Sequence, residues 1–173
     1  MIWIILAIIA LVFGLVVFRG APYVPSHKKS IHQAFTDLYP LSAADYLVDI
    51  GSGDGVVLRM ASKFGAQTVG YEINPILVLI SRFLSRKDSH VSVRLADFWL
   101  TNLPDKTTVV YVFSVTRDMD KIAKRLQSQA DKLGRAISLI VYGSKINGIK
   151  SVKSVGAYNL YEFHSLQPGK PQV

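Results

Sequence analysis

The sequence predicts an α/β fold: a doubly wound, mainly parallel sheet that ends in an antiparallel hairpin and is preceded by one transmembrane helix. Short apolar runs without alternation, typical of buried parallel strands, take turns with stretches of helical periodicity. A glycine-rich turn at residues 51–55 directly follows the first of these runs. Residues 1–18 contain no charged side chain and are rich in Ile, Leu, Val and Phe.

Composition narrows the possible functions. A chain of 173 residues without an internal repeat is expected to form one compact domain. It has no cysteine, which excludes disulfides and thiolate metal sites, and its 4 histidines lack paired ligand spacing, so we predict no metal. The net charge of +8 favours an anionic partner, either a nucleic acid or a phospholipid surface.

The first segment, residues 1–18, is predicted to span a membrane. As a helix it would be about 27 Å long at about 1.5 Å per residue, close to a hydrocarbon core of about 30 Å. The alternative is a buried or interfacial helix. We expect residues 19–25 to be a linker and residues 26–173 to form the functional domain.

The charges that follow this segment predict its orientation. Arg19, Lys28 and Lys29 lie on its C-terminal side, which by the positive-inside rule places the N-terminus outside and the domain in the cytoplasm. No transit peptide precedes the apolar segment. The sequence therefore favours a bacterial plasma membrane over the mitochondrial inner membrane.

The domain is predicted to begin with a helix over residues 26–38, capped by Ser26 and carrying apolar side chains on one face. Packing against the sheet is one role for this region. The alternative is that residues 23–26, Tyr-Val-Pro-Ser, shape the mouth of a ligand site.

A first strand over residues 46–49 then runs into Gly51, Gly53 and Gly55. Glycine permits torsions and close approaches that a Cβ forbids, and the next helix points unpaired N–H groups at the turn. The third glycine of the dinucleotide fingerprint is replaced by Val56, and the Gly-Lys-Ser/Thr of a phosphate loop is missing. We therefore predict a site for another small molecule, the alternative being a tight turn without a ligand.

The next unit supplies a second site residue. Residues 56–64 show helical periodicity and are followed by Gly65, and residues 68–72 form a second strand. The strand ends in Glu72, twenty-three residues after Asp49, the spacing at which doubly wound nucleoside sites place a carboxylate against the ribose. A solvated strand-end acid is the alternative reading of Glu72.

The remaining elements complete the sheet. Asn74 and the proline that follows it predict the start of a helix that reaches residue 84. Further strands are expected at residues 91–95, 109–115 and 136–142, a helix at 118–133, and a terminal hairpin at 151–155 and 158–164.

Several motifs together resemble one family. These are Val-Asp-Ile-Gly-Ser-Gly-Asp-Gly at 48–55, Gly-Tyr-Glu-Ile-Asn-Pro at 70–75, Asp-Phe-Trp at 97–99, Val-Phe at 112–113 and the Tyr-Val-Pro-Ser segment. They resemble the membrane-anchored class I protein-lysine methyltransferases, which use S-adenosylmethionine (SAM) and have a Rossmann-like sheet. That family includes the mitochondrial enzymes that methylate the ATP synthase c subunit and the adenine nucleotide translocase, and bacterial relatives.

The resemblance implies a SAM site. The methionine part of SAM would be held by the glycine turn and its preceding acid, the ribose by Glu72, and the adenine by the residues after the second and third strands. The implied cofactor-binding residues are Asp49, Gly51, Ser52, Gly53, Glu72, Ile73, Asp97 and Phe98. A strand-end acid without a ligand is the alternative for Asp97.

The resemblance also implies residues that face the acceptor. These are Tyr23, Pro25, Trp99, Phe113 and Ser114. Trp99, Phe113 and Tyr142 are candidates for the apolar walls of a lysine pocket, with a packing role as the alternative. No catalytic base can be named from the residues.

The chain departs from the family pattern in three places. Val56 stands where the family commonly has Arg, Leu100 where it has Lys, and residues 114–117 lack an expected proline. These differences concern the region that faces the acceptor, so the substrate is less strongly implied than SAM.

The predicted function is methyl transfer from SAM to a lysine amine of a membrane protein, by an enzyme anchored in the bilayer. Two alternatives are a nucleic-acid or small-molecule methyltransferase and a membrane-tethered SAM-binding protein without turnover. The Asn/Asp-Pro-Pro-aromatic motif of amino-directed nucleic-acid enzymes is not matched at residues 114–117. A nucleic acid is therefore not expected as the partner.

Overall fold

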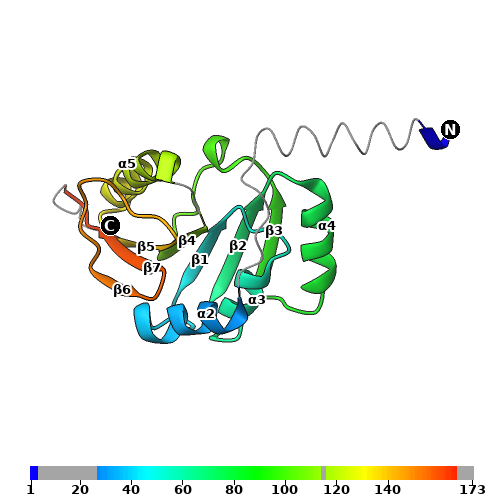
Figure 1. The fold of residues 1–173 in the computed structure, drawn as a ribbon, viewed down its shortest axis with the longest axis horizontal. Coiled ribbons are helices and arrows are strands. Elements are labelled where there is room, and N and C mark those ends of the chain that lie inside the picture. Colours follow the sequence, from blue (N-terminus) through cyan, green and yellow to red (C-terminus); the bar gives the residue numbers. More distant parts are fainter. Residues whose placement is uncertain (4–26, 114–115, 167–173) are drawn as a thin grey trace, which may run out of the picture.

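The computed structural model describes residues 1–3, 27–113 and 116–166, and these contain one mixed sheet of seven strands (Figure 1). The strand order is β3-β2-β1-β4-β5-β7-β6. In chain order the strands are β1 Tyr46–Ile50, β2 Gln67–Glu72, β3 Val91–Leu95, β4 Val109–Phe113, β5 Ile137–Tyr142, β6 Lys153–Val155 and β7 Tyr158–Phe163. The first five strands are parallel, and β7 pairs antiparallel with both β5 and β6.

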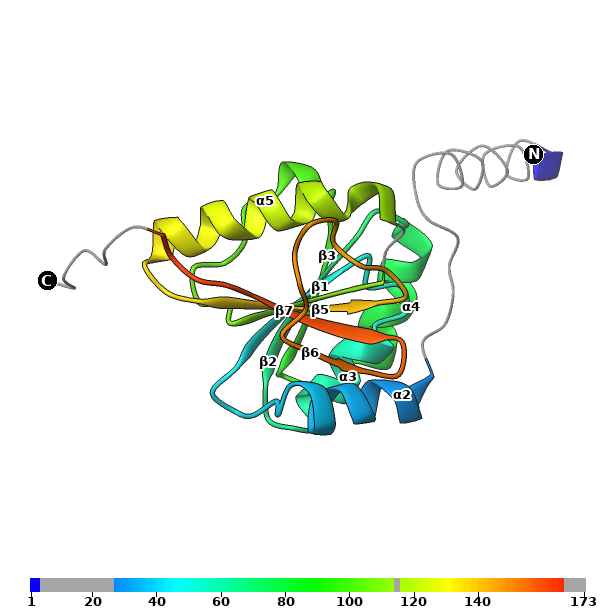
Figure 2. The same ribbon diagram turned by 60° about the vertical axis from the view of Figure 1, so that its left-hand side comes forward.

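Helices cover both faces of this sheet (Figure 2). Helix α5 lies on one face, and α2 and α3 lie on the other. The helical elements are α2 Lys28–Gln33, the π-helical η1 Ala34–Leu38, α3 Val56–Ser62, α4 Pro75–Leu84, the 3₁₀ turn η2 Phe98–Leu100 and α5 Thr116–Leu133. The core is accordingly divided into two clusters of buried apolar side chains, one on each face of the sheet.

The strand order reverses between β1 and β4, which are hydrogen-bonded neighbours. In open sheets of this kind, ligands bind outside the carboxyl ends of the strands at such a reversal. Here the carboxyl ends of β1 and β2 carry the predicted glycine turn and Glu72. The doubly wound sheet and its terminal hairpin are thus confirmed, and the predicted site lies where this topology places ligands.

The element boundaries agree with the predicted ranges to within about two residues. The first helix has His27 as its N-cap without a side-chain bond, and its last turn is π-helical because Tyr39 N donates to Ala34 O (2.9 Å). The predicted cap Ser26 lies outside the described residues, as does the end of the strand predicted to reach residue 115. The short helix η2 was not predicted, since three residues are too few to show a period.

The predicted single-pass membrane protein is not found. The segment predicted to span, residues 1–18, falls mostly outside the described residues, as does the predicted linker at 19–25. In the part of the chain that the structure describes, no helix has both the length and the apolar character needed to cross a bilayer. Helix α4 is apolar but only about 15 Å long, and α5 carries charged residues along its whole length. The predicted localisation is therefore wrong.

A stability prediction arises from Gly55, the N-cap of α3. Its φ is +78°, and an added Cβ would lie 2.1 Å from Ser81 Oγ, which is fully buried. Gly148 has a similar φ of +71° with nothing within 4 Å of such a Cβ. We expect Gly55→Ala to lower the free energy of unfolding by about 2 to 4 kcal/mol, and Gly148→Ala by only about 1 kcal/mol, since strain alone acts there.

Urea unfolding followed by circular dichroism measures both values. Adding Ser81→Ala to Gly55→Ala removes the clashing oxygen and is expected to recover part of the loss. Equal losses for the two single glycine variants would contradict the assigned clash.

Candidate active site

The glycine turn is tied to the end of the neighbouring strand. Gly51 N and Ser52 N both donate to the carbonyl oxygen of Tyr71, at 2.9 and 3.1 Å. Gly55 N donates to Ser52 O at 2.8 Å, which closes the turn. Gly51 and Gly53 have φ of +73° and +55°, a conformation that side chains disfavour. The backbone is therefore held in a fixed loop at the carboxyl end of β1.

Glu72 fastens the same loop from its other side. Its Oε2 accepts from Gly53 N at 2.9 Å, and its Oε1 accepts from Asn74 N at 2.8 Å. The side chain is only 8% exposed. Each carboxylate oxygen has two lone pairs, so both oxygens keep the capacity to accept a further bond from a ligand hydroxyl. Glu72 thus shapes the turn and keeps acceptor capacity at the carboxyl end of β2.

Asp49 is the most deeply buried acid of this site, at 2% exposure. Burial raises its pKa well above the ordinary value, and the nearby carboxylates of Glu72 and then Asp54 raise the pKa further. Desolvation and like charge both disfavour the ionised form. A cationic ligand group at this site would stabilise the ionised form of Asp49, because it would offset both the loss of hydration and the repulsion between the carboxylates.

A charged pair that was not predicted from the sequence supports the turn. Arg59, on the first turns of α3, contacts Asp54 through Nη2 to Oδ2 at 3.3 Å and through Nη1 to the backbone oxygen at 2.5 Å. The family's Arg position is occupied by Val56, yet the structure places a guanidinium on Asp54 from one helical turn later. The spacing of Asp54 and Arg59 across a helix start could have indicated this pair.

The predicted adenine-binding residues lie after β2 and β3. Ile73 follows Glu72 directly and is 36% exposed, so part of its apolar surface is accessible at the end of β2. Asp97 Oδ1 accepts from Trp99 N at 2.8 Å and caps η2. Phe98 is buried, with the Arg125 guanidinium 4.5 Å from its ring centre. Contact of these residues with adenine stays a prediction.

Ser52 and Trp99 differ in how much surface they offer. Ser52 is buried, and its hydroxyl lies against Gly70, since a Cβ on Gly70 would be 2.4 Å from Ser52 Oγ. The backbone N–H and carbonyl of Ser52 are both bonded within the turn, and its buried hydroxyl has no hydrogen-bond partner among the described residues. Trp99 packs edge-on against Phe98 and keeps 42% of its surface exposed.

An aromatic cluster lies at the carboxyl ends of β4 and β5. Phe113 and Tyr142 are register partners on these strands, and their half-buried rings stack with centroids 5.2 Å apart at 21°. Tyr158 meets Tyr142 edge-on at 4.8 Å. Burial raises the pKa of Tyr158, and its hydroxyl lies 3.2 Å from that of Tyr111, the register partner of Asp49. Tyr23, Pro25 and Ser114 lie outside the described residues.

The residues present fit SAM. An added Cβ at Gly51 would meet nothing within 4 Å, so the turn leaves open space on its outer side. Asp49 offers a carboxylate for the ammonium group of SAM, and Glu72 offers acceptors for ribose hydroxyls. Among the residues that the structure describes, no group of three or more His, Cys, Asp and Glu side chains could hold a metal ion.

Solved structures share this architecture. An RNA methyltransferase from Salinibacter ruber, determined with S-adenosyl-L-homocysteine, superposes with a TM-score of 0.73 and 23% identity, covering 87% of this chain and 100% of that one. The 23S rRNA methyltransferase ErmE has a TM-score of 0.58 and 17% identity, covering 69% and 48% of the two chains. At these identities the likeness concerns the fold alone. The fold is that of the class I methyltransferases, whose methyl donor is SAM.

The family follows from sequence comparison. Residues 49–141 match the ANTKMT methyltransferase domain, and this chain belongs to that family. Over 120 residues it is 35% identical to the lysine N-methyltransferases of the ATP synthase c subunit from Xenopus laevis and Homo sapiens, covering 68% of this chain and 52% and 50% of the relatives. The chain thus spans about half the length of these curated relatives.

The relatives also bear on the predicted compartment. They come from vertebrates, including Rattus norvegicus and Mus musculus. A bacterial plasma membrane was predicted on the ground that no transit peptide precedes residues 1–18. These relatives give no support to the predicted bacterial plasma membrane.

Proposed function

We propose that this chain transfers methyl groups from SAM to the side-chain amine of a lysine in a protein acceptor. The observation that carries the proposal is the match over 120 residues to lysine N-methyltransferases. Their stated acceptor, the ATP synthase c subunit, is the first acceptor to test. That the acceptor is a membrane protein stays a prediction.

The aromatic cluster supports a lysine acceptor. SAM supplies an activated methyl group, so the protein has to align the acceptor amine and remove its proton. A lysine amine has a reference pKa of about 10.4, and desolvation lowers this value by disfavouring the ammonium form. The stacked Phe113 and Tyr142 rings form an apolar wall beside the crevice that would exclude water from the amine.

The buried acids have a separate task. Asp49 and Glu72 would hold SAM by its ammonium group and ribose, while the fixed glycine turn would orient it along the ends of β1 and β2. Asp49 lies on β1 and Glu72 at the end of β2, whereas Phe113 and Tyr142 lie at the ends of β4 and β5. We therefore assign the acids at the ends of β1 and β2 to SAM, and the aromatic side chains at the ends of β4 and β5 to the lysine amine.

Incubation of the purified full chain with SAM and the ATP synthase c subunit tests this function. We expect mass spectrometry of the acceptor to show added methyl groups on a lysine. Methyl transfer to RNA without transfer to protein would overturn the lysine assignment. SAM binding without transfer to this acceptor or to any other protein of a membrane extract would favour the non-catalytic alternative.

The aromatic wall gives a sharper prediction. Tyr142→Ala is expected to lower kcat about tenfold or more, because the acceptor amine would keep more of its water, while the Kd for SAM stays within about twofold. Tyr142→Phe keeps the ring and is expected to retain activity. Single-turnover methylation and calorimetry with SAM measure the two quantities. Loss of activity in the Phe variant would indicate a role for the hydroxyl instead of the ring.

A further inference from the structure

Helix α4 carries its large apolar side chains on the side away from the protein. Its buried residues are Val78 and Ser81, and Leu77 is half-buried. The exposed side chains recur at the spacing i, i+3, i+4, i+7 and i+8, and we call them the α4 stripe: Ile76, Leu79, Ile80, Phe83 and Leu84. Leu79 and Phe83 are 65% and 63% exposed.

The placement of apolar side chains on α4 is the reverse of that on most surface helices. A helix on the surface of a water-soluble protein normally turns its apolar stripe toward the core. Contiguous exposed apolar surface marks an interaction site. Helix α4 lies at the edge of the molecule, on the side opposite to the hairpin (Figure 1). The α4 stripe is therefore a docking surface.

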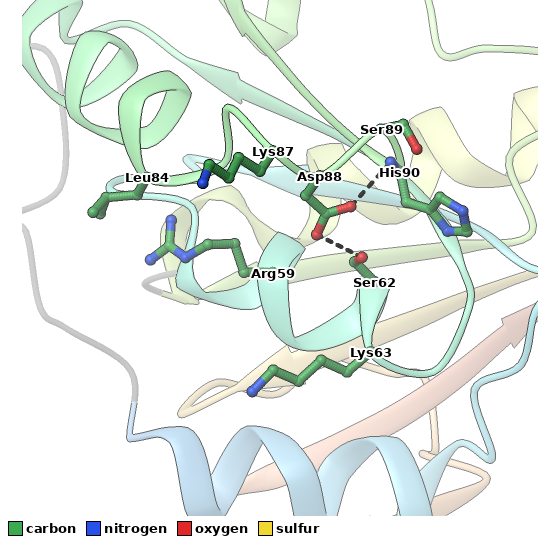
Figure 3. A pocket seen from close by; sticks show the side chains of 8 residues that line it. All are labelled: Arg59, Ser62, Lys63, Leu84, Lys87, Asp88, Ser89 and His90. Atoms are coloured by element: carbon green, nitrogen blue, oxygen red, sulfur yellow. Dashed lines mark hydrogen bonds between the residues drawn. The ribbon is translucent and has the colours of Figure 1, made fainter.

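A basic cavity of about 480 Å³ adjoins the stripe and shares Leu84 with it. Figure 3 shows Arg59, Lys63 and Lys87 extending from the cavity wall toward the side on which Leu84 lies. The acid of this cavity, Asp88, is turned inward, where it accepts from Ser62 Oγ at 2.7 Å and from a backbone N–H at 3.0 Å.

Two of the cations of this surface, Lys63 and Lys87, are available to a partner, whereas Arg59 is paired with Asp54. Among the ion pairs of the described residues, none involves Lys63 or Lys87. Arg86 lies with its guanidinium 4.3 Å from the centre of the Phe83 ring, at the border of the α4 stripe. An apolar stripe with basic side chains along its border is the pattern of helices that lie in a membrane interface.

We propose that α4 docks on a bilayer that contains anionic lipids, with the α4 stripe in the acyl boundary and lipid phosphates in the basic cavity. Charge complementarity selects this occupant. A second copy would bring the same cations against each other, and residues 1–18 contain no acid to pair with them. The contact lies along the membrane surface and needs no helix that crosses it.

Docking of α4 on a bilayer is a property separate from methyl transfer and does not depend on it. Helix α4 is capped by Asn74, whose backbone N–H bonds to Glu72. Glu72 precedes this cap by two residues, so a membrane against α4 would lie close to the predicted SAM site. This arrangement favours acceptors that are themselves at the membrane surface.

A local probe tests the contact directly. The chain has no cysteine, so Ile80→Cys in the full chain provides a unique attachment point for a polarity-sensitive fluorophore. We expect a blue shift on vesicles of phosphatidylcholine mixed with phosphatidylserine. The control is Val152→Cys, 61% exposed beside the distant hairpin, whose probe is expected to stay in water. An unshifted probe at position 80 would overturn the proposal, since binding through another part of the chain leaves it in water.

Two double variants separate the apolar and charged parts. Leu79→Glu with Phe83→Glu is expected to weaken partitioning about tenfold or more. Lys63→Ala with Lys87→Ala is expected to weaken it about thirtyfold on anionic vesicles, at about fivefold for each lysine, and to leave phosphatidylcholine vesicles unaffected. Lys150→Ala serves as the matched charge control, and retained SAM binding shows that each variant is folded.

Two results would reject the lipid assignment. Equal partitioning of the unaltered chain to neutral and anionic vesicles would show that the basic cavity holds no headgroup. A probe at position 80 that is already shielded without vesicles would show that another segment or a second copy covers the stripe.

Discussion

Asp49→Asn is expected to stabilise the protein without ligand and to weaken its binding of SAM. Asp49 is buried, and burial together with the charges of Glu72 and Asp54 raises its pKa. Ionisation of Asp49 is therefore unfavourable in the folded protein. One pKa unit corresponds to about 1.4 kcal/mol, so removal of the charge should add on the order of 1 kcal/mol or more to the free energy of unfolding at neutral pH.

The sign of the pH dependence follows from the same shift. Between the ordinary pKa of an aspartate and the raised pKa of Asp49, the folded protein binds more protons than the unfolded chain. The contribution of Asp49 to stability consequently falls as the pH rises through this window, and it is constant above the raised pKa. The gain from Asp49→Asn should therefore grow as the pH rises and then level off.

SAM binding is expected to move in the opposite direction. A carboxylate paired with an ammonium group contributes about 1.5 to 3 kcal/mol, so Asn at this position should weaken binding about tenfold to a hundredfold. Denaturant titrations at several pH values and calorimetry with SAM measure the two effects. Asp105→Asn is the matched control because Asp105 is exposed, with only an exposed ion pair to Lys132. A destabilised Asp49→Asn protein would refute the assigned burial cost.

The fold could be predicted because its signals are local. Strand β3 was predicted at its observed residues, since an alternation of apolar and polar side chains is readable from few neighbours. Asn74 was predicted as the cap of α4, and its Oδ1 accepts from Ile76 N at 3.0 Å. Placement of β7 between β5 and β6 was not predicted, because pairing of distant strands depends on the whole sheet.

The site was predictable only in part, for a related reason. The glycine turn and Glu72 are set by spacing along the chain, and the structure joins them through the bond from Gly53 N. The ion pair between Asp54 and Arg59 depends on where the two side chains point, and the spacing of the residues does not determine this. The exposed stripe of α4 was missed because its period is that of any amphipathic helix, and a period does not tell which face turns inward.

Glu72→Ala is expected to damage both the fold and the site. Its carboxylate is the acceptor for Gly53 N and Asn74 N, and both bonds are buried. Loss of the carboxylate leaves two buried N–H groups without an acceptor, at about 1 to 3 kcal/mol each. We expect the free energy of unfolding to fall by about 2 to 5 kcal/mol.

Glu72→Ala is expected to weaken SAM binding as well as to lower the stability of the fold. Without Glu72 the ribose loses its charged acceptor and the glycine turn loses one of its ties, so affinity should drop by a few kcal/mol. Glu72→Gln keeps one acceptor oxygen and should fall between the alanine variant and the unaltered chain in both respects.

Glu162→Ala is the control, since this glutamate is exposed and pairs only with His164 at 3.3 Å, and its loss should cost under about 1 kcal/mol. Differential scanning calorimetry with and without SAM separates the two quantities, because ligand raises the melting temperature only where binding persists. A Glu72→Ala protein whose melting temperature still rises with SAM as it does in the unaltered chain would show that the ribose is held by another residue.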